Sequence, residues 1–295
     1  MTHRRRCAIA PGLVLLVAGV LSAVAACRAP APPASGTGPA SGGGAAPSAG
    51  CRPGMLPALV GEARTIDVDG LARRYLIDAP AGSADAALPL VLVFHGFRHS
   101  AAGLRAGLDF AQRAASGALV AVHADGRDDV RLLDRIGRGW DVAPGDTRDT
   151  AFVRAILDTL ERERCIDRRR IFATGFSNGG FLSNLLGCQL GDRLAAIAPV
   201  AGARPLDACT PPQPMPVLFF HGSADRVVPP RLTAGAAAWW RRANGCGDGD
   251  EARDGCRATQ GCAADVVVCE GTQAHTWPSD ASAAIWRFFE AHPRP

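Results

Sequence analysis

Short apolar runs alternate with longer stretches of mixed polarity over most of the chain after residue 70. Several short runs are nearly continuous Val, Leu, Ile and Phe, which is typical of strands covered on both faces of a parallel sheet. These runs predict strands over 72–80, 88–96, 119–126, 169–177, 194–202, 216–225 and 265–271. The stretches between them place apolar residues at helical spacing and predict helices over 101–115, 149–163, 178–189, 231–244 and 281–292.

This alternation of strands and helices predicts an α/β fold with a mostly parallel sheet and helices on both of its faces. In such folds the functional groups gather beyond the carboxyl ends of the strands. Four segments lie at such ends: His95-Gly96, Ser177, Asp225 and the loop that carries His275. The sequence therefore predicts a functional site at this edge of the sheet.

Residues 1–27 have the composition of a secretory signal, with arginines at 4–6, an apolar run and a small-residue end. Their last four residues, Val24-Ala25-Ala26-Cys27, resemble a bacterial lipobox, in which the cysteine is lipidated and becomes the new N-terminus. We therefore expect a secreted lipoprotein, anchored through Cys27 to the bacterial cell envelope (periplasm, outer membrane or cell surface). The alternative is ordinary cleavage after Ala25, which leaves Cys27 as a spare thiol.

Residues 28–50 contain only Ala, Pro, Gly, Ser, Thr and one Arg. Such a segment buries too little apolar surface to offset the entropy of ordering, so we expect a flexible linker. Residues 51–295 are long enough for one α/β domain with a substantial core.

The charge pattern bears on the partners of the chain. The net charge is only +4, and the basic residues are scattered among the acidic ones. No basic stripe with interleaved aromatic residues occurs, which argues against nucleic acid as a partner. We expect a monomer whose contact with a membrane is limited to the N-terminal lipid anchor.

The cysteines predict disulfides. Apart from Cys7 and Cys27 there are eight: Cys51, Cys165, Cys188, Cys209, Cys246, Cys256, Cys262 and Cys269. An even number in a secreted chain favours disulfide bonds. We expect one bond between Cys188 and Cys209 and two among the last four. A zinc site near Cys256 and Cys262 is the alternative, but the chain has no CxxC pair.

The stretch Gly175-Phe176-Ser177-Asn178-Gly179 fits G-x-S-x-G between a predicted strand and a predicted helix. In this context the motif is typical of a sharp elbow that exposes a nucleophilic serine, with glycines where side chains do not fit. Ser177 is therefore the predicted nucleophile. The alternative is a small residue in an ordinary glycine turn.

A serine hydroxyl needs a base, and the base needs an acid to orient it. His275 follows the last predicted strand, and Asp225 ends an earlier one, so the chain order is Ser, Asp, His, as in serine hydrolases of this type. His95 and His221 precede glycines at strand ends, where a role in orienting a loop is expected. For Asp225 the alternative is a residue that caps its own turn.

The oxyanion of such a reaction needs two N–H donors directed at one point. Asn178 provides one from the N-terminus of a predicted helix, where the helix dipole also favours negative charge. Phe97, in the loop after the predicted strand 88–96, provides the other. Because both donors are backbone groups, we expect side-chain identity at these two positions to be permissive.

With these residues in view, the chain resembles the polyhydroxybutyrate-depolymerase-like and feruloyl esterase group of secreted α/β-hydrolases, which is similar to carbohydrate esterase family 1. The matching stretches are RRYLIDAP, VFHGF, GRGWD, DTAF, CIDRRRIFATGFSNGGF, LAAIAPVAG, HGSADRVVP and HTWP. The resemblance implies an α/β-hydrolase fold and a Ser177–Asp225–His275 triad, with Phe97 and Asn178 as oxyanion donors. It also implies that neither a metal ion nor an organic cofactor is used.

Two departures limit the resemblance. Members often have paired aspartates before the phenylalanine of the DTAF stretch, whereas here the first position is Arg148. The chain also carries no separate polymer- or carbohydrate-binding module, which argues against an insoluble polyester as substrate.

Trp140 and Trp277 are candidates for the walls of the acyl pocket. The alternatives are that Trp140 only packs in the core and that Trp277 braces the His275 loop.

These patterns predict a serine esterase that acts on small-molecule or polymer-linked carboxylic esters through an acyl-enzyme. A serine peptidase of the α/β type is one alternative. A relative of dienelactone hydrolases is another, although those enzymes usually have cysteine at the elbow. The third is a surface lipoprotein that binds a ligand without catalysis.

Overall fold

A sheet of ten strands forms the centre of the chain in the computed structural model, which describes residues 46–83, 86–143 and 147–295. The predicted signal at 1–27, Cys27 and most of the predicted linker lie outside the described residues. The strand order is β12-β13-β14-β11-β10-β9-β5-β6-β3-β2. Within the described ranges, no helix has both the length and the hydropathy needed to cross a membrane.

The six central strands run parallel to one another, as the apolar runs predicted. They are β6 (Val120–Ala124), β5 (Leu88–Phe94), β9 (Ile166–Phe176), β10 (Ala196–Val200), β11 (Val217–Gly222) and β14 (Val266–Gly271). Antiparallel pairs complete both edges of the sheet. These edge strands are β3 (Leu71–Ala79), β2 (Leu59–Val68), β13 (Cys256–Thr259) and β12 (Asp250–Arg253).

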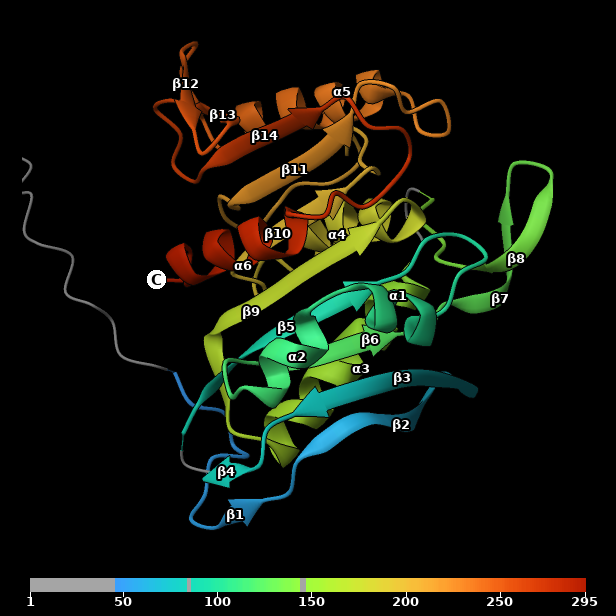
Figure 1. The fold of residues 1–295 in the computed structure, drawn as a ribbon, viewed down its shortest axis with the longest axis vertical. Helices are drawn as coiled ribbons and strands as arrows, with labels where there is room; N and C mark the ends of the chain where they lie inside the picture. Colours follow the sequence, from blue (N-terminus) through green and yellow to red (C-terminus); the bar gives the residue numbers. More distant parts are fainter. Residues whose placement is uncertain (1–45, 84–85, 144–146) are drawn as a thin grey trace, which may run out of the picture. The chain divides into compact units, whose positions relative to one another are not determined.

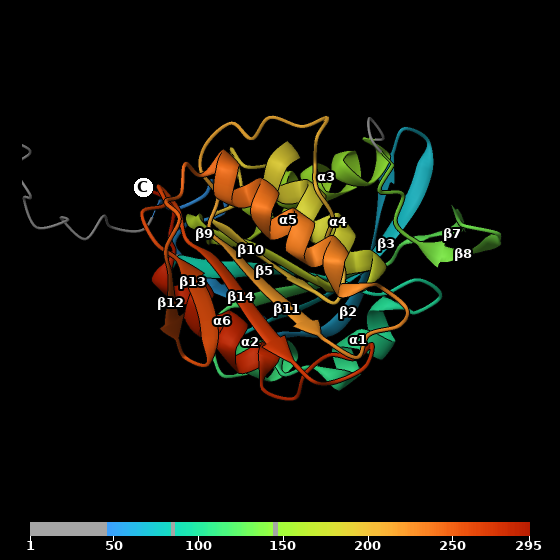
Figure 2. The same cartoon turned by 90° about the horizontal axis from the view of Figure 1, so that it is seen from above.

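Helices cover both faces of the sheet (Figures 1 and 2). On one face lie α3 (Arg148–Glu163), α4 (Asn178–Gln189) and α5 (Pro230–Ala243), and on the other α1 (Ala101–Gly107), α2 (Phe110–Ala115) and α6 (Ala281–Ala291). The packing is close: the rings of Phe172 in β9 and Phe289 in α6 stack with centroids 4.6 Å apart. The predicted α/β class is therefore confirmed.

Several parts of the structure differ from the predicted elements. The predicted helix 101–115 is two helices, because Leu108 takes an extended conformation between them. The edge strands β2, β12 and β13 and the hairpin of β7 (Arg127–Leu132) and β8 (Arg135–Gly139) were not predicted, since exposed residues interrupt their apolar runs. The hairpin projects from the rest of the fold (Figures 1 and 2). A short pair, β1 (Met55–Leu56) with β4 (Gly82–Ser83), was also missed.

Residues 46–50 correct the predicted linker boundary. The Ser48 hydroxyl is buried, donates to the carbonyl of Arg164 at 2.8 Å and accepts from the N–H of Ile166 at 3.0 Å. The N–H of Ala46 donates to Asp167 Oδ1 at 3.0 Å. These five residues belong to the folded unit, because their polar groups are satisfied by β9 and by the residues just before it.

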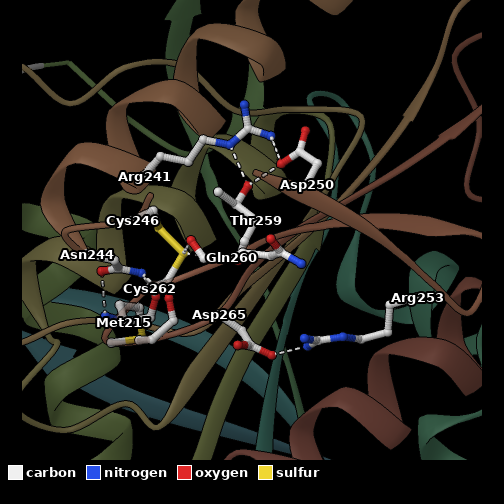
Figure 3. Close-up of a disulfide and its surroundings, with 11 residues drawn as sticks. Met215, Arg241, Asn244, Cys246, Asp250, Arg253, Thr259, Gln260, Cys262 and Asp265 are labelled. Carbon is white, nitrogen blue, oxygen red and sulfur yellow. Dashed lines mark hydrogen bonds and ion pairs between the residues drawn. A yellow bond between two sulfur atoms is a disulfide. The ribbon is translucent and has the colours of Figure 1, made fainter. Parts of the chain in front are cut away.

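Four disulfides join the cysteines of the folded unit. The expected Cys188–Cys209 bond is present, and the last four cysteines pair as Cys246–Cys262 and Cys256–Cys269. The fourth bond, Cys51–Cys165, ties the N-terminal segment to the start of β9. Figure 3 shows the Cys246–Cys262 bond next to Asn244. Four disulfides in one domain are typical of proteins that fold outside the cytoplasm.

The buried His123 in β6 is expected to make the stability of the fold sensitive to acid. Its ring is fully buried, and neither nitrogen has a hydrogen-bond partner in the described part of the chain. Burial lowers the pKa of His123 from 6.5 to about 4, although the carboxylate of Asp78, 3.8 Å away, opposes the shift. Between these two pH values the unfolded chain binds more protons than the folded one, so the free energy of unfolding decreases as the pH falls.

We expect this one histidine to remove up to about 3 kcal/mol of stability between pH 6.5 and pH 4. The His123→Leu variant, which cannot titrate there, should lose less stability over the same range. Urea unfolding at pH 7 and at pH 4.5 measures the difference. An identical pH dependence in wild type and variant would contradict the assignment to His123.

Candidate active site

Ser177 occupies a sharp turn between β9 and α4. Its φ and ψ are 54° and −115°, a left-handed conformation that is strained for a residue with a side chain. The N–H of Ser177 donates to the carbonyl of Val200 at 2.9 Å, which holds the turn against the neighbouring strand β10. The half-buried Ser177 side chain therefore lies at the carboxyl edge of the sheet, as the sequence predicted.

Glycines surround the turn because the backbone approaches too closely for any side chain. A Cβ on Gly179 would lie 2.7 Å from the carbonyl oxygen of His95, and one on Gly175 would lie 2.9 Å from that of Phe94. Gly202 is equally constrained, since its Cβ would lie 2.7 Å from the carbonyl carbon of Ser177. Gly202 was not singled out from the sequence, although its position at the end of the predicted strand 194–202 was a usable signal.

The structure brings together the three residues predicted to form the triad. His275 Nε2 lies 2.9 Å from Ser177 Oγ, and His275 Nδ1 lies 2.7 Å from Asp225 Oδ2. An ionised carboxylate can only accept, so the proton of the neutral imidazole is on Nδ1. His275 Nε2 is therefore free to accept the proton of the serine hydroxyl, which is the geometry that a general base requires.

Asp225 is held as a buried carboxylate. Its side chain is inaccessible to solvent, and Oδ1 accepts from the N–H groups of Val227 and Val228, both at 2.9 Å. Burial on its own raises the pKa of Asp225, but the hydrogen bonds from His275 and from the two N–H groups outweigh it and leave the pKa below its usual value. The group is thus charged at neutral pH and can stabilise a protonated His275.

His221 orients the Asp225 loop, as its position at a strand end indicated. Its Nε2 lies 2.9 Å from the carbonyl of Val228 and 3.3 Å from Asp225 Oδ2, and both of these oxygens accept. The ring therefore carries a proton on Nε2 and fixes both ends of the turn. Its Nδ1 lies 2.7 Å from the hydroxyl of Thr233 in α5, which anchors the ring to a helix.

The His275 loop is held from two sides. The ring of Phe176 packs against the imidazole of His275 with centroids 4.9 Å apart. Trp277 is half-buried, and its Nε1 donates to the hydroxyl of Ser282 in α6 at 3.1 Å. This contact matches the bracing alternative for Trp277. Its predicted place in the pocket wall stays a prediction.

The two predicted oxyanion donors flank Ser177. Asn178 is the first residue of α4, where a backbone N–H has no acceptor within the helix. Phe97 lies in the loop after β5, and the preceding Gly96 is so close that a Cβ on it would lie 3.4 Å from Ser177 Cβ. The donor roles stay predictions, but both residues lie beside the elbow.

The structure corrects the prediction that Trp140 lines the acyl pocket. Its side chain is 1% exposed, and its ring packs edge-on against Phe94 with centroids 5.3 Å apart. Its Nε1 donates to the carbonyl of His95 at 2.8 Å. The ring is therefore part of the core beneath the site and does not form an open pocket wall, because the aromatic face is covered on all sides by the fold.

A cavity of about 520 Å³ is lined in part by the β7–β8 hairpin. It is lined by five arginines and four aspartates from the β2–β3 edge and from the segment 125–148 that includes the β7–β8 hairpin. Most of these charges pair with one another, as Arg127 does with Asp129 at 2.7 Å and Arg138 with Asp128 at 2.7 Å. None of the three triad residues lines this cavity.

Sequence comparison relates the chain to esterases. No protein-family model matches it. Feruloyl esterase B of Piromyces equi is 34% identical over 164 residues, which cover 53% of this chain and 30% of that protein. The chain thus spans less than a third of this relative's length. The match confirms the predicted similarity to feruloyl esterases.

Solved structures support the fold. The acetyl xylan esterase from Aspergillus awamori matches with a TM-score of 0.61 at 15% identity, over 77% of this chain and 99% of that one. A CE1 ferulic acid esterase from Anaeromyces mucronatus, in complex with ferulic acid, matches with a TM-score of 0.55 at 14% identity, over 80% of this chain and 92% of that one. The predicted α/β-hydrolase fold is confirmed.

Proposed function

We propose that this chain is a serine carboxylic-ester hydrolase that acts through an acyl-enzyme on feruloyl or related acyl esters. The observation that carries the proposal is the hydrogen-bonded series from Ser177 Oγ through His275 to the buried Asp225 carboxylate. An α/β-hydrolase sheet with this series at its carboxyl edge is suited to acyl transfer. The similarity to feruloyl esterase B supports the choice of substrate class.

In the first step, Ser177 Oγ attacks the ester carbonyl carbon while His275 Nε2 accepts the hydroxyl proton. Asp225 stabilises the imidazolium, and the N–H groups of Phe97 and Asn178 stabilise the oxyanion. The tetrahedral intermediate then breaks its bond to the alcohol, which leaves with the proton from His275. The acyl group remains on Ser177.

In the second step, water attacks the acyl carbonyl carbon and gives a proton to His275. The second tetrahedral intermediate breaks its bond to Ser177 Oγ, which regains the proton, and the carboxylic acid is released. One ester and one water thus yield one alcohol and one acid. The same histidine serves as base and as acid in both steps.

The substrate class is tested by kcat/KM of the chain on methyl ferulate and on p-nitrophenyl butyrate. Higher kcat/KM on the ferulate ester is the expected result and supports a pocket for hydroxycinnamoyl groups. Preference for the butyrate would contradict the feruloyl class and would instead favour the short acyl or hydroxyacyl esters of polyhydroxybutyrate-depolymerase-like enzymes. No turnover of either ester would contradict the esterase itself.

The lipid anchor is part of the same proposal. The signal-like composition of residues 1–27 and the lipobox ending at Cys27 support it. Labelled palmitate should enter the full chain expressed in bacteria, and it should not enter the Cys27→Ser variant. Equal labelling of the two chains would contradict lipidation at Cys27.

A further inference from the structure

We infer that the side chain of Asn178, together with Gly139 and Trp140 at the end of the β7–β8 hairpin, fixes the spacing of the two oxyanion donors. This inference rests on the proposed function and deepens it, because it assigns a positioning role to a side chain that the sequence left permissive. Asn178 would then have two roles. Its backbone N–H would donate to the oxyanion, and its side-chain amide would hold the hairpin end through two hydrogen bonds to Trp140, which we call the clamp.

The clamp consists of two hydrogen bonds to a single residue. Asn178 Oδ1 accepts from the backbone N–H of Trp140 at 2.7 Å, and Asn178 Nδ2 donates to the backbone carbonyl of Trp140 at 3.0 Å. The side chain is 2% exposed, so both bonds lie out of water, where their loss leaves unsatisfied polar groups. Both the position and the orientation of the first turn of α4 are thereby fixed relative to the hairpin.

Trp140 continues the connection to the other donor. Its indole Nε1 donates to the carbonyl of His95, two residues before Phe97, at 2.8 Å. Its ring also packs against the His95 ring with centroids 5.2 Å apart. One residue of the hairpin end is therefore bonded both to the elbow that carries Asn178 and to the loop that carries Phe97.

Gly139 lies directly between the two donor residues. A Cβ at Gly139 would lie 2.7 Å from Asn178 Oδ1 and 2.9 Å from the ring of Phe97. The backbone of β8 thus touches both residues at once and acts as a spacer that leaves no room for a side chain. The position requires glycine because of contact on both sides, since its φ does not fall in the left-handed region.

Hydrogen bonds of the His95 ring also hold the loop that carries Phe97. Its Nδ1 lies 2.7 Å from the carbonyl of Gly96, which can only accept, so Nδ1 carries the proton. Its Nε2 then accepts from the N–H of Gly126 at 2.9 Å. Burial lowers the pKa of His95, so the ring stays neutral and Nε2 stays an acceptor. The backbone N–H of Arg98 donates to the backbone carbonyl of Arg138 in β8 at 2.7 Å, which is a second hydrogen bond between this loop and the hairpin.

Oxyanion donors are effective only when both are held in the productive geometry, and loss of one donor costs roughly 10²–10³-fold in kcat. Loosening the clamp should displace a donor without removing it. We therefore expect Asn178→Ala to lower kcat roughly 10–100-fold, with KM for p-nitrophenyl butyrate within about threefold of the wild type. Inhibition by phenylboronic acid, which forms a tetrahedral adduct with the serine, should weaken by a similar factor.

Asn244 offers a matched control (Figure 3). It is also a buried asparagine that accepts from and donates to the backbone of one residue, Met215, at 3.1 and 2.7 Å. Met215 precedes β11, whereas Asp225 follows it, so this clamp lies at the edge of the sheet opposite the triad. Asn244→Ala should therefore reduce thermal stability while the folded protein keeps its kcat and its boronic acid inhibition.

Unchanged kcat in Asn178→Ala, or a loss of kcat no larger than in Asn244→Ala, would overturn the inference. If Asn178→Ala does not fold, Trp140→Phe decides, because it keeps a buried aromatic ring and the backbone bonds to Asn178 but removes the donor to His95. A folded Trp140→Phe protein with wild-type kcat would overturn the inference as well. Failure of the proposed function is recognised separately, since the wild type would then hydrolyse no ester at all.

Discussion

Replacement of Ser177 by alanine is expected to lower kcat for p-nitrophenyl butyrate by roughly 10⁵–10⁶-fold while the domain stays folded. In the proposed mechanism the hydroxyl oxygen forms the acyl-enzyme, and His275 Nε2, at 2.9 Å, accepts its proton. The fold should tolerate the change, because Ser177 is half-buried and its backbone strain is the same for alanine.

Kinetic assays together with circular dichroism and thermal unfolding measure both parts of this expectation. Ser116→Ala is the control, since that hydroxyl caps α2 at an exposed position and bonds only within its own turn. A fluorophosphonate probe should label the wild type and Ser116→Ala but not Ser177→Ala. Turnover of Ser177→Ala at the wild-type rate would refute the nucleophile assignment.

Replacement of Asp225 by asparagine is expected to lower kcat by roughly 10⁴-fold. The two N–H groups of Val227 and Val228 would hold the amide oxygen, so the amide nitrogen would face His275 Nδ1. The imidazole then has to accept on Nδ1 and carry its proton on Nε2. In that tautomer it cannot take the proton of Ser177.

Another aspartate–histidine pair, away from the triad, serves as a control. Asp265 lies 3.3 Å from His292 Nε2 and also pairs with Arg253, but it is partly exposed and lies at the start of β14 (Figure 3 shows its contact with Arg253). Asp265→Asn should keep wild-type kcat. A loss in Asp225→Asn no greater than in Asp265→Asn would show that Asp225 has no part in the reaction.

Much of this site could be predicted because its signals are local. G-x-S-x-G around Ser177 encodes a turn that only glycines permit, and Asp225 and His275 follow apolar runs that had to be strands. Because parallel strands end at one edge of a sheet, residues 48 and 50 positions apart were expected to meet there. The Cys188–Cys209 bond could also be predicted, because these two cysteines are close together in the chain.

Trp140 and Asn178 mark the limit of sequence-based prediction. Apolar periodicity indicates that a residue is buried, but it does not say against what, so Trp140 could equally line a pocket or fill the core. The Asn178 clamp joins residues 38 positions apart through backbone atoms, which every residue possesses. Such a contact leaves no pattern in the chain.

The sequence alone predicted the order of the parallel strands and of the helical segments between them, the elbow at Ser177 and the two residues that lie next to it, because these depend on local periodicity and on glycine conformation. Only the tertiary structure decided that residues 46–50 join the fold, that Trp140 is covered and that the hairpin end connects the two predicted oxyanion donors. Those features depend on how separate segments pack together, and packing is a property of the whole chain.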